Sequence, residues 1–253
     1  MHDVVVGLIV AAFVFAGGLV GLFLPRFLPR AHLSKQTEDV VRLGTGMLSV
    51  LSSLVLGLLI ATAKSSYDTT ERAIEGYSAE LVLLAEALRD YGDSADAPRK
   101  LLRQYVEQTL NDVWSDEGRG ALALADRGGG MLLERVRESI RALKPVDDGQ
   151  RWLQEQALQI NVSLLRQRWL LVEQAGPTVR PVILGILVSW ISFIFVSFGL
   201  NAPRNGTVIG AFLICSLAIG GSIFLILQMD SPFAGLLKIS SWPMDQALTY
   251  MTP

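Results

Sequence analysis

The chain has 253 residues, of which 51% are hydrophobic, and its formal net charge is −2. The net charge is close to zero and the basic residues form no stripe along the sequence, so the charge pattern does not indicate a nucleic-acid-binding protein. The single cysteine, Cys215, excludes an intrachain disulfide.

Four stretches of the sequence contain no Asp, Glu, Lys or Arg, and each has roughly the 20 residues that cross a hydrocarbon core. They are Val4–Leu24, Leu43–Ala63, Val182–Leu200 and Thr207–Leu227. We therefore predict an all-α membrane protein with two spans before, and two after, an inserted helical domain. The predicted segments are 1–63 (two spans and their loop), 64–181 (helical domain), 182–229 (two spans) and 230–253 (C-terminal segment).

The loop after the first span is basic, whereas no Lys or Arg precedes that span. Its basic residues are Arg26, Arg30, Lys35 and Arg42. Basic residues near span ends are retained on the cytoplasmic side during insertion. Arg204, between the third and fourth spans, fits the same orientation. We therefore expect the N-terminus and the helical domain to lie on the outer side of the membrane.

The second span carries a stripe of small and hydroxyl-bearing residues at spacings of three and four: Gly46, Ser49, Ser53, Gly57 and Ala61. Small residues let helices approach closely in a membrane, so one interpretation is a helix-packing seam. The other is a pore on an oligomer axis, where small polar side chains leave width for ions and nearby Leu and Val form a dewettable gate.

Two charged residues follow this span. If the stripe lines a pore, Lys64 and Asp68 would lie at its outer mouth and bias ion selection. The third and fourth spans carry lesser stripes, which we interpret as packing seams. These are Gly185, Ser189, Ser192 and Gly199, and then Ala211, Cys215, Ala218 and Ser222.

In the inserted domain, apolar residues recur at intervals of three and four, which predicts an antiparallel helical bundle. The second span is expected to continue into it without a break as far as Gly92. A later helix is predicted from Met131 to Leu143, after three consecutive glycines. The last helix, about 151–174, is expected to turn its apolar residues inward: Trp152, Leu158, Val162, Leu165 and Trp169.

The sequence Asp230-Ser231-Pro232-Phe233-Ala234-Gly235 follows the fourth span. Asp230 or Ser231 could cap a helix that Pro232 opens, and Ser241-Trp242-Pro243 is predicted to start a second short piece. The apolar run here is too short to span. We therefore predict that residues 230–253 form an interfacial or re-entrant segment.

The sequence contains no catalytic constellation. Its two histidines, His2 and His32, lack metal-ligand spacing, and neither a glycine-rich phosphate loop nor a G-x-S-x-G motif occurs. The expectation is therefore a protein that is not an enzyme and has no cofactor or metal.

Three short motifs resemble those of the bestrophin-like domain family of bacterial membrane proteins. One is the pair Pro25-Arg26 and Pro29-Arg30, and another is Ala63-Lys64-Ser65-Ser66-Tyr67-Asp68 at the end of the second span. The most specific is the Asp230 to Gly235 motif, with Asp230, Pro232, Phe233 and Gly235, followed by Lys238-Ile239-Ser240.

The resemblance implies an integral protein of the bacterial inner membrane that forms a homo-oligomer and passes small inorganic ions. Bestrophins proper are oligomeric anion channels whose second membrane helix lines the pore, which would place the Gly46–Gly57 stripe on the axis. A different class stays open: a non-conducting scaffold or sensor whose helical domain binds an envelope partner.

Overall fold

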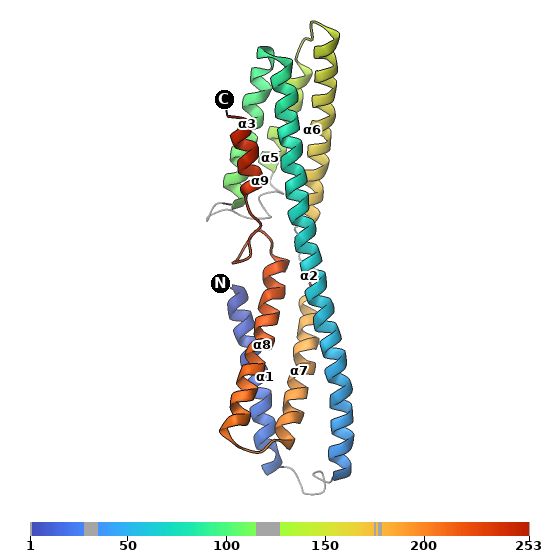
Figure 1. The fold of residues 1–253 in the computed structure, drawn as a ribbon, viewed down its shortest axis with the longest axis vertical. Helices are drawn as coiled ribbons and strands as arrows, with labels where there is room; N and C mark the ends of the chain where they lie inside the picture. Colours follow the sequence, from blue (N-terminus) through green and yellow to red (C-terminus); the bar gives the residue numbers. More distant parts are fainter. Residues whose placement is uncertain (1, 28–34, 115–126, 175, 177–178, 253) are drawn as a thin grey trace. The chain divides into compact units, whose positions relative to one another are not determined.

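The computed structural model describes residues 2–27, 35–114, 127–174, 176 and 179–252. Within these ranges the chain is helical and has no strand, so the predicted all-α class is confirmed (Figure 1). Four of the described helices are long and apolar enough to cross a membrane. The chain divides into two compact units, which we call unit 1 (Met1–Ser66 and Pro177–Asp230) and unit 2 (Tyr67–Gly176 and Ser231–Pro253).

Unit 1 is formed around the first helix, α1 (His2–Phe23), which ends in a 3₁₀ turn, η1 (Leu24–Arg26). α1 packs against both α7 (Pro181–Asn201) and α8 (Gly206–Asp230), and the first part of α2 (Lys35–Tyr91) completes the unit. The buried apolar core is drawn from all four helices: Val14, Leu22, Leu59, Ala63, Leu187, Ile191, Phe195, Phe212, Ile223 and Ile226.

Glycines let α1 lie against its neighbours at close range. A Cβ at Gly21 would be 2.1 Å from the Val196 carbonyl oxygen of α7, and one at Gly220 of α8 would be 2.5 Å from the Gly7 carbonyl oxygen. Such backbone-to-backbone approach is the usual way that membrane helices associate. The helix-packing seam of unit 1 is therefore centred on α1.

α2 is a single helix of 57 residues that supplies both units. It contains no proline, and at 1.5 Å per residue it is about 85 Å long. It stops before Gly92, whose φ of +103° is a left-handed conformation that favours glycine after a helix C-terminus. The predicted continuity from the second span as far as Gly92 is therefore observed.

Unit 2 combines the second part of α2 with α3 (Asp96–Trp114), α5 (Arg127–Arg141), α6 (Asp148–Gln174) and α9 (Trp242–Tyr250); a 3₁₀ turn, η3 (Asp93–Ala95), precedes α3. Its core is a cluster of large apolar side chains and two tyrosines, including Ile74, Tyr77, Leu81, Leu84, Leu88, Leu102, Tyr105, Leu133, Ile140, Leu164 and Leu171. α5 begins earlier than predicted, because the run Gly128 to Gly130 is already helical.

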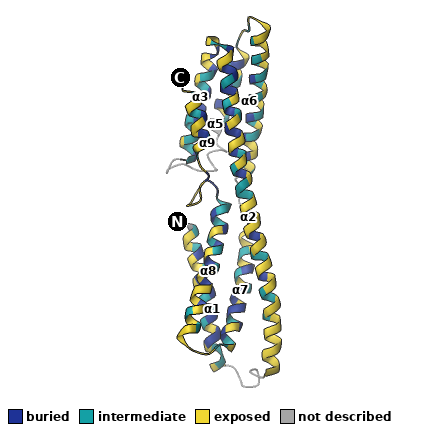
Figure 2. Cartoon of the chain, in the orientation of Figure 1, coloured by how far each residue is buried: buried dark blue, intermediate teal, exposed yellow. Residues whose placement is uncertain are grey.

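The prediction for the inward face of α6 is wrong for three of its five residues. Figure 2 shows that α6 carries both exposed and buried positions. Trp152, Val162 and Trp169 are 61%, 54% and 68% exposed, whereas Leu158 and Leu165 are half-buried. The buried residues are instead Ala157, Asn161, Leu164, Arg168 and Leu171. Asn161 Nδ2 donates to the Leu133 carbonyl and Arg168 Nη1 donates to the Tyr105 hydroxyl, so partners inside the unit orient the helix.

Candidate functional site

Within unit 1, one face of α2 packs against the other helices. Ser52, Leu59 and Ala63 are buried, and the Thr45 hydroxyl donates to Ser197 Oγ of α7 across 2.8 Å. Even so, α2 is the least covered of the four apolar helices. In its most apolar stretch 17% of the residues are buried, compared with 33%, 33% and 28% for α1, α7 and α8. Most residues of this part of α2 are therefore exposed within the chain.

The small-residue stripe lies on the uncovered part of α2. Gly46, Ser53, Gly57 and Ala61 are exposed, and Ser49 is half-buried, with its hydroxyl donating to the Thr45 carbonyl across 2.8 Å. A Cβ added at Gly46 or Gly57 would meet no heavy atom within 4 Å. Within the chain, the stripe is therefore not a packing seam, in contrast with the glycines of α1.

The two predicted mouth residues differ in exposure. Lys64 is exposed and belongs to unit 1, whereas Asp68 is half-buried and belongs to unit 2. Both residues already take part in interactions within the chain. Their role at a pore mouth stays a prediction.

The lesser stripes of α7 and α8 pack only in part. A Cβ at Gly199 would lie 2.3 Å from the Gly18 carbonyl oxygen, so that position is a close contact. Gly185 has open space around it, and Ser189 and Cys215 are exposed. The seam interpretation therefore applies to some positions of these stripes and not to others.

The C-terminal motif does not form the helix that we predicted from Pro232. Residues 232–237 form turns and bends, and the Ile239 amide donates to the Pro232 carbonyl across 2.9 Å. Gly235 has a φ of +88°, which a helix does not allow. The second predicted piece is a helix, α9, which follows Ser241.

The four motif residues have different surroundings. Asp230, the last residue of α8, accepts a hydrogen bond from the Val179 amide across 3.0 Å within unit 1. Pro232 and Phe233 are buried in unit 2, and Gly235 is exposed. Phe233, Met244 and Ala247 are part of the unit 2 core, so part of the segment that we predicted to be interfacial is packed against protein, whereas Leu236 and Trp242 are exposed.

A buried polar network in unit 2 was not predicted from the sequence. The hydroxyl oxygens of Tyr77 and Tyr105 are 2.5 Å apart, and Arg168, only 6% exposed, donates to Tyr105 across 3.1 Å. Burial and then the adjacent Tyr105 raise the pKa of Tyr77 well above its ordinary value. Its residues are spread over three helices, so no local spacing revealed it. Among the described residues, no group of three His, Cys, Asp or Glu side chains could hold a metal ion.

These observations define an integral membrane protein that is helical within its described residues and has four apolar helices long enough to cross a membrane. The family model of the Bestrophin-like domain matches residues 12–244, so the chain belongs to the bestrophin-like domain family. No curated protein matches the sequence.

Solved structures with the same fold include variants of a bacterial bestrophin homologue from Klebsiella pneumoniae. One has a TM-score of 0.69 at 11% identity, covering 97% of this chain and 95% of that one. A second has a TM-score of 0.67 at 13% identity, covering 96% and 97%. At this identity the likeness shows the fold, which is that of the bestrophin homologue.

Proposed function

We propose that this protein is a homo-oligomeric ion channel of the inner membrane, with two spans on either side of the helical domain and the α2 stripe around the central axis. Membership of the bestrophin-like family and the bestrophin fold support a membrane channel. The observation that carries the assignment to α2 is the uncovered stripe itself. A Cβ at Gly46 or Gly57 would meet no other atom within 4 Å and Ser53 is exposed, although small residues are those that usually pack closely in membranes.

The chemistry of the stripe suits an ion path. The hydroxyl of Ser53 offers polarity, and the glycines leave width, in a segment (43–63) that contains no charged residue. Val50 lies between Gly46 and Ser53 on the same side of α2 and is 70% exposed. We propose that a ring of Val50 side chains forms the dewettable gate.

The basic first loop supports an orientation with the helical unit on the periplasmic side. A single cysteine can test this. In a Cys215→Ser background, Val146→Cys, which is 84% exposed in unit 2, should react with a membrane-impermeant maleimide on intact spheroplasts. Pro203→Cys, between α7 and α8, should react only after lysis. The reverse pattern would place the helical unit in the cytoplasm and leave the channel proposal standing.

Ion flux into liposomes that hold the purified protein tests conduction. Wild type should pass ions above the rate of empty vesicles, and Ser53→Trp should block the flux. Leu51→Trp is the matched control, because residue 51 lies about 160° around the helix from residue 53 and is also exposed. A stable oligomer that passes none of several anions and cations would favour the scaffold instead.

A further inference from the structure

One side of α6 is an aromatic surface with no cover from its own chain. This surface, which we call the α6 face, contains Trp152, Val162, Arg166, Trp169 and Leu170, all of them exposed. Trp152 and Trp169 are both more than 60% exposed, which is unusual for a free surface. Each tryptophan ring has a large apolar area, and its burial in an interface would stabilise that interface. The α6 face therefore has the composition of an interface core.

A second uncovered surface of unit 2 is a groove of about 530 Å³ between α2 and α9. Its lining is mainly apolar, with Ala79 and Val82 from α2 and Trp242 from α9, and Glu75 lies at one end. We call it the α2–α9 groove.

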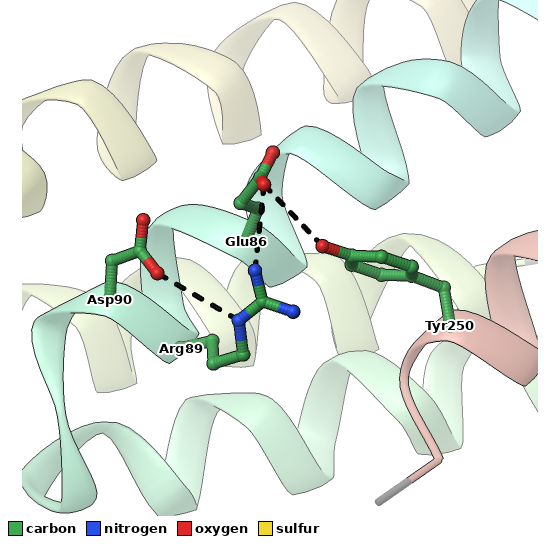
Figure 3. Close-up of polar contacts among 4 residues, drawn as sticks. All are labelled: Glu86, Arg89, Asp90 and Tyr250. Carbon is green, nitrogen blue, oxygen red and sulfur yellow. Dashed lines mark hydrogen bonds and ion pairs between the residues drawn. The ribbon is translucent and has the colours of Figure 1, made fainter.

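Tyr250 fixes one wall of this groove. Its hydroxyl donates to Glu86 Oε1 across 3.4 Å, and the Arg89 guanidinium lies 5.2 Å from the centroid of its ring (Figure 3). Arg89 also pairs with Glu86 and Asp90, at 3.5 and 3.8 Å. Contacts inside unit 2 therefore hold Tyr250 in place beside the groove.

The two surfaces lie at the same height along unit 2. Ser163 of α6 donates to Glu80 of α2 across 3.0 Å, and Gln150 Nε2 donates to the Tyr91 carbonyl across 3.0 Å, so the two helices run antiparallel in a known register. With a rise of 1.5 Å per residue, Arg166 is level with Glu75 to within about 3 Å. In Figure 1, α6 and α9 lie on different sides of this part of α2.

The two surfaces carry opposite charges at one shared height. Arg166 of the α6 face is level with the acidic Glu75 of the groove. Two surfaces of one chain that carry opposite charges at the same height fit each other across a contact between two copies.

We propose that the α6 face of one copy docks into the α2–α9 groove of the next copy, with Arg166 opposite Glu75. The contact is head to tail, because the two surfaces differ. When each copy docks onto the next without a shift along the axis, the copies form a closed ring. This inference deepens the proposed function, since it names the contact that would hold the subunits around the α2 axis.

Chemical cross-linking tests the contact in the full-length protein. In a Cys215→Ser background, Val162→Cys lies on the α6 face and Gln246→Cys lines the groove. A short bis-maleimide should join chains of a mixture of the two single variants into dimers, and the double variant should give a ladder of multimers. Each single variant alone should stay uncross-linked, and so should Val162→Cys mixed with Met131→Cys, an exposed position on α5.

Charge reversal gives a second readout by native mass spectrometry. Arg166→Glu should weaken assembly roughly tenfold or more, and Glu75→Arg in the same chain should restore it. Dimers from Val162→Cys alone, or an intact oligomer with no cross-link between positions 162 and 246, would overturn the docking proposal and leave the channel proposal untouched. A monomeric wild type would overturn both.

Discussion

The indole Nε1 of Trp114, at the end of α3, donates to the carbonyl oxygen of Ile239 across 2.8 Å, although the two residues are 125 positions apart. The Trp114 ring also meets Phe233 edge to face, with 5.8 Å between ring centroids. Trp114 thereby holds both Phe233 and Ile239 of the C-terminal segment against the end of α3.

Trp114→Phe should destabilise the protein by about 1–3 kcal/mol, because the buried Ile239 carbonyl would lose its donor. Phe233→Ala should cost more, about 3–5 kcal/mol, because it removes a buried aromatic ring. Thermal unfolding of both variants in detergent measures this order. Equal midpoints for Trp114→Phe and wild type would show that the hydrogen bond contributes nothing.

Gly21→Ala should lower the thermal midpoint, because the new Cβ would lie 2.1 Å from the Val196 carbonyl oxygen and force α1 away from α7. We expect a loss of about 1–3 kcal/mol, the usual cost of overpacking. Gly221→Ala in α8 is the matched control, since it points into open space and alanine favours a helix. A similar effect from both substitutions would argue against the close α1–α7 contact.

The Tyr77–Tyr105 pair should make stability fall at alkaline pH. Burial and Tyr105 raise the pKa of Tyr77, an effect that Glu80 increases and Arg168 opposes. A group whose pKa is raised on folding contributes fully below its unfolded pKa, here about 10, and this contribution is lost as the pH rises through the folded pKa. The free energy of unfolding should therefore decline above pH 10.

Tyr77→Phe separates this effect from other titrations. Near neutral pH it should cost about 1 kcal/mol for the lost hydrogen bond. Above pH 10 its stability should decline less steeply than that of wild type, and one tyrosine fewer should ionise on unfolding. Unfolding curves with tyrosinate absorbance check both, and parallel declines would mean that Tyr77 is not the responsible group.

The sequence predicted the apolar helices and the continuity of α2 because charge-free length and the absence of proline are local properties. It did not predict which side of α6 is buried, because the apolar pattern favours Trp152 and Trp169 whereas the polar partners of Asn161 and Arg168 come from α5 and α3. Likewise, the sequence around Gly21 does not indicate that this residue packs against the backbone of Val196, because Val196 comes from a distant part of the chain.

The stripe of α2 shows what a sequence leaves open about a candidate site. Its composition allowed both a packing seam and a pore lining. The structure argues against the seam within the chain, because Gly46 and Gly57 face open space. Whether the stripe faces an ion path depends on other copies of the chain, which the pattern of one sequence does not describe.

The most direct test of the central claim is water access to Ser53. In a Cys215→Ser background, Ser53→Cys reconstituted in liposomes should react with a small hydrophilic thiol reagent, and the reaction should abolish ion flux. Leu51→Cys should conduct equally well and stay insensitive to the same reagent. Flux that is unchanged after complete modification of residue 53 would contradict a path lined by the α2 stripe.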